Sequence, residues 1–355
     1  MPLVMAPLGL RAVDLLDQGE RTRLDAYVRA HPLGTPFHLS AWSKAVSEGS
    51  GQVSHTLVAE QADGTLVGMV PLTEIRSMLF GKALVSNGFA VGGGILADSD
   101  EAVRALGDAA WALAEKLACP TLDLRSGVAQ GSEWIVDDRT YLGFVRPLAA
   151  SDEEELAAIP RKQRAEVRKA LENDLEVVTG SGAPAAREHY AVYAESVRNL
   201  GTPVFPARLF RAVLREFGED ADILTVRHRG RAVASVLNLY MNGTVFPYWG
   251  GGTSAARTLR ANDRLYFALM AHARGKGCAR FDFGRSKAGT GAAAFKKNWG
   301  FQPVPLMYVT RAARGGAPRE INPLNPRYRL KVEAWKKLPL WAANLFGPLI
   351  SRGLG

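Results

Sequence analysis

The segment from Phe281 to Phe301, FDFGRSKAGTGAAAFKKNWGF, holds the residue types best suited to acid, base or anion chemistry. Asp282 stands between two phenylalanines in a predicted short buried strand, and GRSK then turns the chain outward. The residues Gly289–Gly291 predict a flexible turn that opens a helix from Ala292 to Asn298. A glycine-rich turn at a helix N-terminus presents backbone N–H groups that favour an anion.

Four cations flank this turn: Arg285 and Lys287 before it, and Lys296 and Lys297 one turn into the helix. One interpretation is a corner that binds an anion or stabilises an oxyanion. The other is a tight strand-to-helix connection with solvated lysines, and spacing alone leaves both open. The segment does not match the P-loop spacing G-x-x-x-x-G-K-[ST].

A second group of candidates ends another predicted strand, where Tyr248 and Trp249 precede the glycines Gly250–Gly252. Glycines allow the backbone to approach a ligand closely, and aromatic side chains can wall a pocket. Core packing at a strand end explains them equally well. Asn238 interrupts an apolar strand pattern, which indicates either a lined cleft or a position facing solvent.

Ser151 to Val177 is a charged stretch whose first part is acidic and whose second part is basic. From Arg164 to Leu175 it predicts an amphipathic helix with Val167, Ala170 and Leu171 inward. It is either a solvated connecting helix or a basic lip over a substrate phosphate. The lip would consist of Arg161, Lys162, Arg164, Arg168 and Lys169.

Other catalytic patterns are missing from the sequence. The six histidines do not pair at i, i+4, and no HExxH, CxxC, GxSxG or GxGxxG motif occurs. We therefore expect no metal site, no serine hydrolase triad and no nicotinamide cofactor.

The elements that must position these residues occur twice. Leu57 to Leu72 and Leu224 to Leu239 each predict a β-hairpin with a glycine turn. FAVGGGI (from Phe89) parallels PYWGGGT (from Pro247), and a predicted helix follows each, after an N-cap at Asp98 and near Asn262. Cys119 and Cys278 then each precede an aspartate by four residues in a predicted strand. This order, repeated at a nearly constant offset, indicates duplication rather than chance.

The repeated unit alternates helices and strands, so we expect an α/β (α+β) fold with two domains, each a mixed sheet flanked by helices. The predicted boundaries are residues 1–150 for the first domain, 151–180 for the basic linker, 181–312 for the second domain with the site, and 313–355 for a tail.

Composition limits the function classes. The chain has 355 residues, 47% apolar and 22% charged, which excludes a disordered chain, a fibrous repeat and a disulfide scaffold. Of the net charge of +9, +7 lies from Arg311 onward. The nearly neutral body argues against DNA as a partner and against a function limited to RNA binding without acyl transfer. Two cysteines and an N-terminus without a signal-like pattern predict a cytoplasmic protein.

The tail from Ile321 mixes basic residues with large apolar ones, and we predict that it contacts an anionic membrane surface. The alternative is that its apolar face packs on the protein body. The basic residues are Arg327, Arg329, Lys331, Lys336, Lys337 and Arg352, and the apolar ones are Trp335, Leu338, Leu340, Trp341, Leu345 and Phe346.

Taken together, these motifs resemble the FemAB/FemX-like acyltransferases, which have tandem GNAT-like domains. NLGTPVFP, YWGGG, ANDRLYFALMAHARGKG and the segment from Phe281 carry the resemblance in the second half. TPFHLSAWSKAV and PRKQRAEVRKALENDLEV carry it in the rest. The sequence is most similar to FemAB-related proteins of PEP-CTERM/exosortase (exopolysaccharide) systems, over about residues 30 to 345.

The resemblance implies an N-acyltransferase. It would transfer an acyl or aminoacyl group to an amine or hydroxyl of a cell-envelope, peptidoglycan or exopolysaccharide precursor. The family's Phe-Lys pair aligns with Phe295 and Lys296, which implies that Lys296 stabilises the developing oxyanion. The implied substrate-binding residues are Arg285, Lys287, Lys297, Tyr248, Trp249, Asn238, Asp282, Arg257, Arg260, Arg164 and Arg168.

Two departures leave the acyl donor open. Ser151 to Val177 is too short for the long helical-hairpin arm of some members, which puts aminoacyl-tRNA in doubt. In Arg257 to Asn262, an arginine stands where the GNAT pyrophosphate loop has its first glycine, which puts acyl-CoA in doubt. We expect the donor to be a co-substrate, with no covalently bound cofactor. The alternative function is a non-catalytic glycan- or headgroup-binding scaffold of envelope assembly, located in the cytoplasm or peripherally at the inner membrane.

Overall fold

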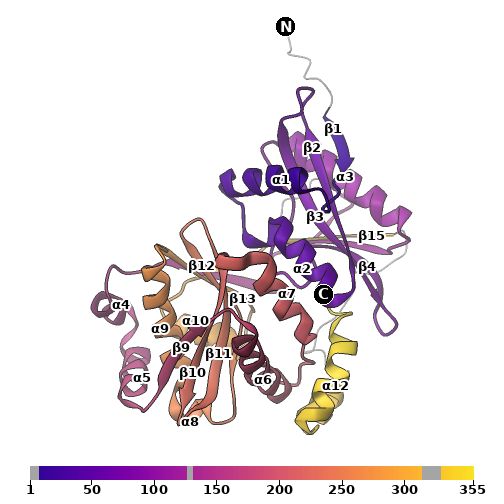
Figure 1. Ribbon diagram of the computed structural model, residues 1–355. Helices are drawn as coiled ribbons and strands as arrows, with labels where there is room; N and C mark the ends of the chain where they lie inside the picture. Colours follow the sequence, from indigo (N-terminus) through magenta and orange to yellow (C-terminus); the bar gives the residue numbers. More distant parts are fainter. Residues whose placement is uncertain (1–7, 126–130, 314–328) are drawn as a thin grey trace. The chain divides into compact units, whose positions relative to one another are not determined.

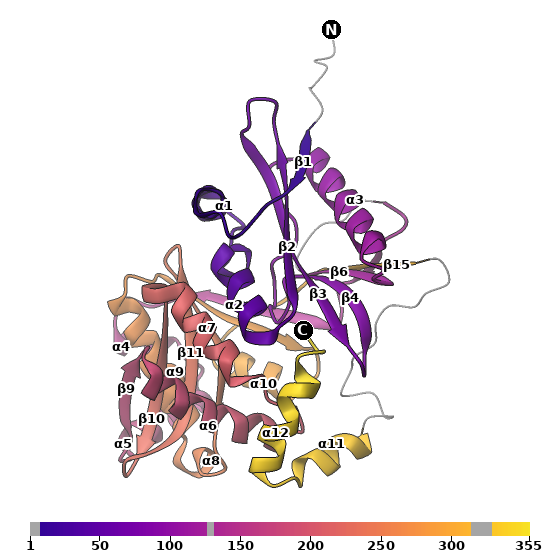
Figure 2. The same ribbon diagram turned by 45° about the vertical axis from the view of Figure 1, so that its right-hand side comes forward.

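The computed structural model describes residues 8–125, 131–313 and 329–355. The chain forms two compact units (Figures 1 and 2). Unit 1 comprises Met1–Asp138, Leu306–Ile321 and Arg352–Gly355, and unit 2 comprises Arg139–Pro305 and Asn322–Ser351.

Unit 1 is a mixed sheet with the strand order β1-β2-β3-β4-β6-β15-β7, and β5 pairs with β3. Among the described strands of this unit, only β4 and β6 pair in parallel, and α3 packs on β2 and β3. The strands are β1 (Gly9–Ala12), β2 (Val53–Glu60), β3 (Leu66–Ser77), β4 (Gly81–Ser86), β5 (Leu96–Ala97), β6 (Thr121–Arg125), β7 (Ile135–Asp137) and β15 (Tyr308–Ala312). The helices are α1 (Gln18–Ala30), α2 (Ser40–Ser50) and α3 (Asp100–Lys116), with a 3₁₀ turn at Pro36–His38.

Unit 2 is a second mixed sheet, with the order β14-β8-β13-β12-β11-β10-β9, in which only β12 and β13 are parallel. Its strands are β8 (Tyr141–Pro147), β9 (Glu176–Gly180), β10 (Ala221–His228), β11 (Arg231–Met241), β12 (Thr244–Gly252), β13 (Arg280–Lys287) and β14 (Pro303–Pro305). Its helices are α4 (Asp152–Ala158), α5 (Arg161–Glu172), α6 (Ala183–Asn199), α7 (Ala207–Phe217), α8 (Ala256–Leu259), α9 (Ala261–Gly275), α10 (Gly291–Asn298), α11 (Arg329–Lys336) and α12 (Leu340–Ser351), with a 3₁₀ turn at Gly218–Asp220.

Helices cover both faces of the unit 2 sheet. A Cβ added to Gly250 would lie 3.1 Å from Tyr266 Oη of α9, whereas one added to Gly251 would lie 2.2 Å from Ser196 Oγ of α6. Successive strand residues point to opposite faces, so α6 and α9 pack on opposite sides of the sheet. The core beneath α9 and α10 includes the fully buried rings of Phe281, Trp299 and Phe301.

Both predicted hairpins are present, as β2–β3 and β10–β11. The second turns at Arg229-Gly230, and the next hairpin, β11–β12, turns at Asn242-Gly243. All four of these residues have positive φ, as a two-residue type I′ turn requires. The predicted fold class is confirmed: each unit is a mixed sheet flanked by helices.

The two units divide the sequence differently from the predicted boundaries. β8, from the first half of the sequence, pairs with β13 in unit 2. β15, from the second half, pairs with β6 in unit 1. In each parallel pair, one strand, β6 or β13, is therefore flanked by a strand from the other half of the chain. Unit 2 accordingly begins at Arg139, and Leu306–Ile321 belong to unit 1.

Several local predictions were wrong. The N-cap of α3 is Ser99, whose side chain accepts from Ala102 N–H, rather than Asp98. In α5, Val167 and Ala170 are buried as predicted, but Leu171 is exposed. FAVGGGI is a loop rather than a strand, because β4 ends at Ser86.

Residues 314–328, which include Arg327 of the predicted tail, lie outside the described residues. The rest of the tail forms α11 and α12 in unit 2, and the last four residues belong to unit 1. Within the described residues, we find no helix with the length and apolar character needed to cross a bilayer.

Candidate functional site

The parallel strands of unit 2 separate soon after they meet. β12 and β13 pair at Thr244–Arg280 and Val245–Phe281, and over the described residues of both strands this ladder ends there. Beyond that point β12 continues beside β11, and β13 continues beside β8. We call the stretch formed by Phe246–Gly252 and Asp282–Lys287 the fork. It contains five of the thirteen predicted site residues: Tyr248, Trp249, Asp282, Arg285 and Lys287.

Lys296 lies at the β13 side of the fork. Its Nζ donates to Gly284 O at 3.2 Å and to Arg285 O at 2.9 Å. The same atom lies 5.3 Å from the ring centre of Phe144 and 5.4 Å from that of Phe283. Burial lowers the pKa of Lys296 to about 8, although nearby Asp282 acts in the opposite direction. The ammonium form therefore predominates at neutral pH, but a modest rise in pH removes the proton.

A β-bulge in β13 turns carbonyl groups toward this lysine. The register against β8 shifts between Asp282 and Arg285, and Gly284 within the shift has φ of 66°. Asp282 Oδ1 accepts from Gly284 N–H at 2.8 Å, which holds the bulge. The expectation that GRSK leaves the core as a turn was wrong, because the strand continues to Lys287.

Replacing Gly284 by alanine is expected to lower the free energy of unfolding by about 1–2 kcal/mol. A Cβ there would meet no atom within 4 Å, so the loss comes from the left-handed backbone alone. The matched control is Gly275→Ala at the end of α9, which also has open space but lacks positive φ. Urea denaturation should show a lower midpoint for Gly284→Ala only; equal midpoints would contradict the assigned backbone strain.

Asp282 is the carboxylate of the fork. Burial raises its pKa, and the Gly284 N–H and the Lys296 charge only partly offset that effect. A carboxylate with raised pKa near a lysine with lowered pKa is an arrangement that suits proton transfer. Sequence reasoning predicted Asp282 only as a substrate-binding residue.

Tyr266 was missed by sequence reasoning, although it bridges the two strands of the fork. Its ring lies 4.6 Å from that of Phe283 in β13 and 5.8 Å from that of Phe295 in α10. On the β12 side, its hydroxyl faces Gly250. Burial raises the pKa of Tyr266 to about 12. In the sequence, the only indication of Tyr266 was its position within the helix predicted to begin near Asn262.

Among the candidates in β12, core packing is the interpretation that the structure favours for Trp249 and the glycines. Trp249 is buried, with its ring 4.7 Å from Phe210 of α7. The register between β11 and β12 shifts so that Tyr248 is the extra residue of a second bulge, at the fork. Gly250–Gly252 leave room for side chains of α6, α8, α9 and β11, since a Cβ at any of them would approach these atoms within 3 Å.

Asn238 is fully buried, so the solvent-facing alternative was wrong. Its Nδ2 donates to Asp222 Oδ1 at 2.9 Å, and Tyr240 Oη donates to the same oxygen at 2.8 Å. His272 Nε2 lies 2.7 Å from Asp222 Oδ2. Asn238 therefore helps to satisfy a buried carboxylate, a structural role.

The predicted cations lie in three places: at the fork, on the surface of α10, and away from the fork. Arg285 and Lys287 remain at the fork, where both lie over the ring of Tyr141, at 4.6 and 5.7 Å. Lys297 is exposed on α10. Thr290 Oγ1 accepts from Ala293 N–H. One of the backbone N–H groups predicted to bind an anion at this helix end therefore already has a partner within the chain.

The remaining arginines lie away from the fork. Arg260 Nε donates to Glu166 Oε2 at 2.6 Å, while Arg257 is exposed. Arg164 donates to Ala157 O and Ile159 O, and these two hydrogen bonds cap the end of α4. This capping favours the connecting-helix interpretation for Arg164. The exposed lip residues are Arg161, Lys162, Arg168 and Lys169.

The equivalent place in unit 1 is closed by hydrogen bonds. Over their described residues, β4 and β6 also pair at just two positions, Leu84–Leu122 and Val85–Asp123. Beyond them, Arg125 N–H donates to Ser86 Oγ at 2.6 Å, and its guanidinium donates to Ala90 O at 2.8 Å. These bonds hold the loop after β4 against β6.

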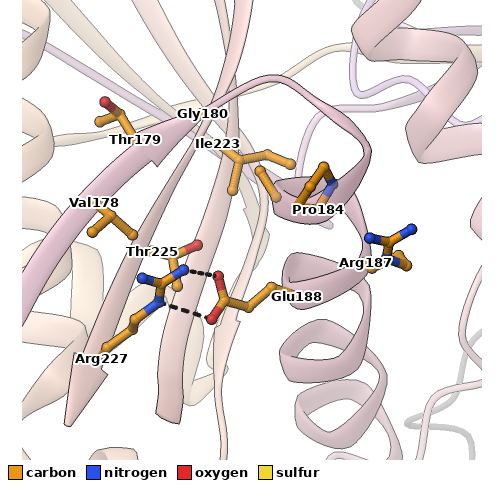
Figure 3. A pocket seen from close by; sticks show the side chains of 10 residues that line it. Val178, Thr179, Gly180, Pro184, Arg187, Glu188, Ile223, Thr225 and Arg227 are labelled. Atoms are coloured by element: carbon orange, nitrogen blue, oxygen red, sulfur yellow. Dashed lines mark hydrogen bonds and ion pairs between the residues drawn. The ribbon is translucent and has the colours of Figure 1, made fainter. Parts of the chain in front are cut away.

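A pocket of about 730 Å³ lies at the far edge of the unit 2 sheet, lined by β9, β10 and the start of α6 (Figure 3). Arg227 and Glu188 face each other across it and form two hydrogen bonds, at 2.9 and 2.8 Å. β10, β11 and β12 separate it from β13, and no predicted site residue lines it.

No group of three or more His, Cys, Asp or Glu side chains in the described part of the chain is arranged to hold a metal ion. The two cysteines are buried and free. Their backbones repeat one contact: Cys119 N–H donates to Ala114 O at 2.8 Å, and Cys278 N–H donates to Ala273 O at 2.9 Å. This match supports the predicted equivalence of the two halves.

Comparison with known proteins assigns a family to the part of the chain that contains the fork. Residues 161–297 match the acetyltransferase (GNAT) domain family. The match begins at the first residue of α5 and includes Phe295 and Lys296. A search of curated proteins found no match.

Solved structures share the fold over nearly the whole chain. A crystal structure of FemX has a TM-score of 0.66 and 14% identity, covering 91% of this chain and 99% of its own. The C-terminal domain of a putative lysylphosphatidylglycerol synthetase from Agrobacterium fabrum has a TM-score of 0.57 and 13% identity, covering 83% and 92%. A tandem GNAT protein from the clavulanic acid biosynthesis pathway has a TM-score of 0.52 and 16% identity, covering 86% and 98%. These similarities confirm the predicted tandem GNAT-like fold.

Proposed function

We propose that the protein is an N-acyltransferase whose reaction takes place at the fork of unit 2. The GNAT domain match of residues 161–297 supports the reaction class. The observation that carries the proposal is the position of the Lys296 ammonium, between the rings of Phe144 and Phe283 and within hydrogen-bond distance of the β13 bulge. A cation in such weakly polar surroundings stabilises a developing negative charge more strongly than one in water.

In the proposed reaction, an amine of the acceptor attacks the carbonyl carbon of an ester or thioester donor. The carbonyl oxygen becomes an oxyanion, which Lys296 stabilises with a hydrogen bond from Nζ. Collapse of this intermediate breaks the bond to the leaving oxygen or sulfur and forms the amide. Asp282 takes the proton that the amine loses, and the leaving group receives a proton in turn, so charge and atoms balance.

For the donor, we propose either an aminoacyl-tRNA or an acyl-CoA as co-substrate. The start of α9 is a poor cradle for a diphosphate, because Glu166 pairs with Arg260 and Asp263 stands in the first turn. That observation favours a donor held by other contacts. For the acceptor, we propose an amine or hydroxyl of a cell-envelope, peptidoglycan or exopolysaccharide precursor, which rests on the resemblance to FemAB-related proteins of PEP-CTERM/exosortase systems.

A non-catalytic role in envelope assembly is the second candidate. It is favoured by the hydrogen bonds from Lys296 to two carbonyl groups of its own unit, which occupy two of its three protons. In that case the lysine would stabilise the β13 bulge, and the fork would bind a glycan or headgroup without transferring an acyl group.

The deciding experiment incubates the full-length protein with labelled aminoacyl-tRNA and with labelled acetyl-CoA, separately, together with envelope precursors that carry free amines. We expect the label to appear in an amide of the acceptor from one of the two donors, as detected by mass spectrometry. Binding of a precursor without transfer from either donor would overturn the enzymatic proposal in favour of the scaffold.

A further inference from the structure

The last two helices of unit 2, α11 and α12, both pack against α6 (Figure 2). Arg198 of α6 donates to Lys336 O at 3.2 Å, and Ser351 Oγ donates to Val204 O at 2.8 Å. A Cβ added to Gly347 would lie 3.0 Å from Val204 N, so the two backbones are in close contact. The helices are therefore held firmly on the body of unit 2.

The side of α12 that faces the protein is made of small residues. Ala343, Gly347 and Ser351 follow one another at intervals of four and are all buried. The predicted alternative, an apolar tail face packed on the body, holds for this stripe and for Val332 of α11, which packs against Gly201. Several other large apolar side chains of the two helices are exposed.

Large apolar residues cover the outward side of α12. Trp341, Leu345 and Leu349 also follow at intervals of four, which places them on one line along the helix. Scattered exposed leucines are common on protein surfaces, whereas a continuous apolar patch marks an interaction site. The exposed fractions are 71% for Trp341, 59% for Leu345, 49% for Phe346, 65% for Leu349 and 81% for Leu330 at the start of α11.

Positive charge accompanies this patch. Lys331 of α11 and Lys337, the residue directly after α11, are both exposed. The only acidic side chain from Arg329 to the last residue is Glu333, which forms an ion pair with Lys336 at 2.7 Å. A patch of this charge repels a second copy of itself but attracts a negatively charged surface.

We propose that Trp341, Leu345, Phe346 and Leu349, together with Lys331 and Lys337, form a docking surface for an anionic lipid bilayer. With 12 residues, α12 is about 18 Å long, too short to span the hydrocarbon core. It lies in the membrane plane instead, with its apolar side in the headgroup boundary and the lysines near the anionic headgroups. The docking surface is separate from the fork and does not depend on the proposed acyl transfer.

The test measures sedimentation of the full-length protein with vesicles of phosphatidylcholine alone or mixed with phosphatidylglycerol. We expect binding to the mixed vesicles, weakened by salt, and at least tenfold weaker binding for the variant Trp341→Ser/Leu345→Ser/Leu349→Ser. Lys331→Glu/Lys337→Glu should lose the preference for phosphatidylglycerol. The matched control is Leu16→Ser/Leu33→Ser, which removes two exposed leucines of unit 1 and should bind normally.

Equal binding by the wild type and the serine variant would overturn the proposal. So would a wild-type dimer, seen by analytical ultracentrifugation, that the serine variant abolishes, because a second copy would then cover the patch. Because the substituted side chains are exposed, thermal unfolding should be unchanged. Transfer to a water-soluble acceptor should persist in the serine variant, so a failure here is distinct from a failure of the acyltransferase proposal.

Discussion

Replacing Lys296 by methionine is expected to reduce acyl transfer by about 10²–10³-fold, the loss typical when a donor to an oxyanion is removed. Methionine keeps most of the volume between Phe144 and Phe283 but has no charge. The matched control is Lys297→Met, on the next residue of α10, whose side chain is exposed. Initial rates with the donor identified in the transfer assay should separate the two variants.

The pH profile gives a second signature of the same lysine. Because burial lowers the pKa of Lys296 to about 8, its charge disappears as the pH rises past that value. If the ammonium stabilises the oxyanion, the rate should fall above about pH 8. Lys296→Arg keeps the charge at higher pH. Its residual activity should therefore lack this fall, and a wild-type rate that does not fall above about pH 8 would contradict the oxyanion-stabilising role of the Lys296 ammonium.

Stability distinguishes a catalytic lysine from a structural one. The lowered pKa of Lys296 means that folding disfavours its charged form, so the ammonium is held at a cost to the folded state. Removing it in Lys296→Met should leave the thermal midpoint unchanged or higher while transfer is lost. A variant that loses transfer only because it unfolds would instead support the bulge-stabilising role.

The sequence predicted those parts of the fold that local patterns determine. Alternating apolar residues around glycine turns predicted the two hairpins, and apolar spacing predicted the helix from near Asn262 to Gly275, which became α9. The partners of β8 and β15 were not predictable in this way. Each pairs with a strand from the opposite half of the sequence, and no local period records such a pairing.

The same limit applies to the candidate site: residues close together in the sequence could be grouped, whereas contacts between distant residues could not be predicted. Asp282 and Lys296 were found because one short segment contains both, and the strand-to-helix turn brings them together. The partners of Arg260 and Asn238, which are Glu166 and Asp222, could not be predicted because they lie elsewhere in the sequence. An isolated cation or amide in a sequence does not show whether its charge or polarity is already satisfied by the protein.

Lowering the pH is expected to destabilise unit 2 through His189, a fully buried residue of α6. Its Nδ1 lies 2.9 Å from Ser235 Oγ, and its ring is surrounded by those of Tyr193 and Phe210. Burial lowers the pKa of His189 to about 3. An unfolded histidine titrates near 6.5, so the unfolded state binds the extra proton throughout the interval between these values.

Stability from this group is therefore fully present above about pH 6.5 and is lost as the pH falls toward 3. At about pH 4.5 the loss amounts to roughly 2–3 kcal/mol. Urea denaturation of wild type and His189→Asn between about pH 7.5 and 4.5 should show a smaller decline in the variant, whatever its stability at neutral pH. Tyr193→Phe, which alters the same ring cluster without removing the histidine, should keep the wild-type decline. Parallel curves for wild type and His189→Asn would show that His189 gains its proton as readily in the folded state as in the unfolded state, which would contradict the lowered pKa.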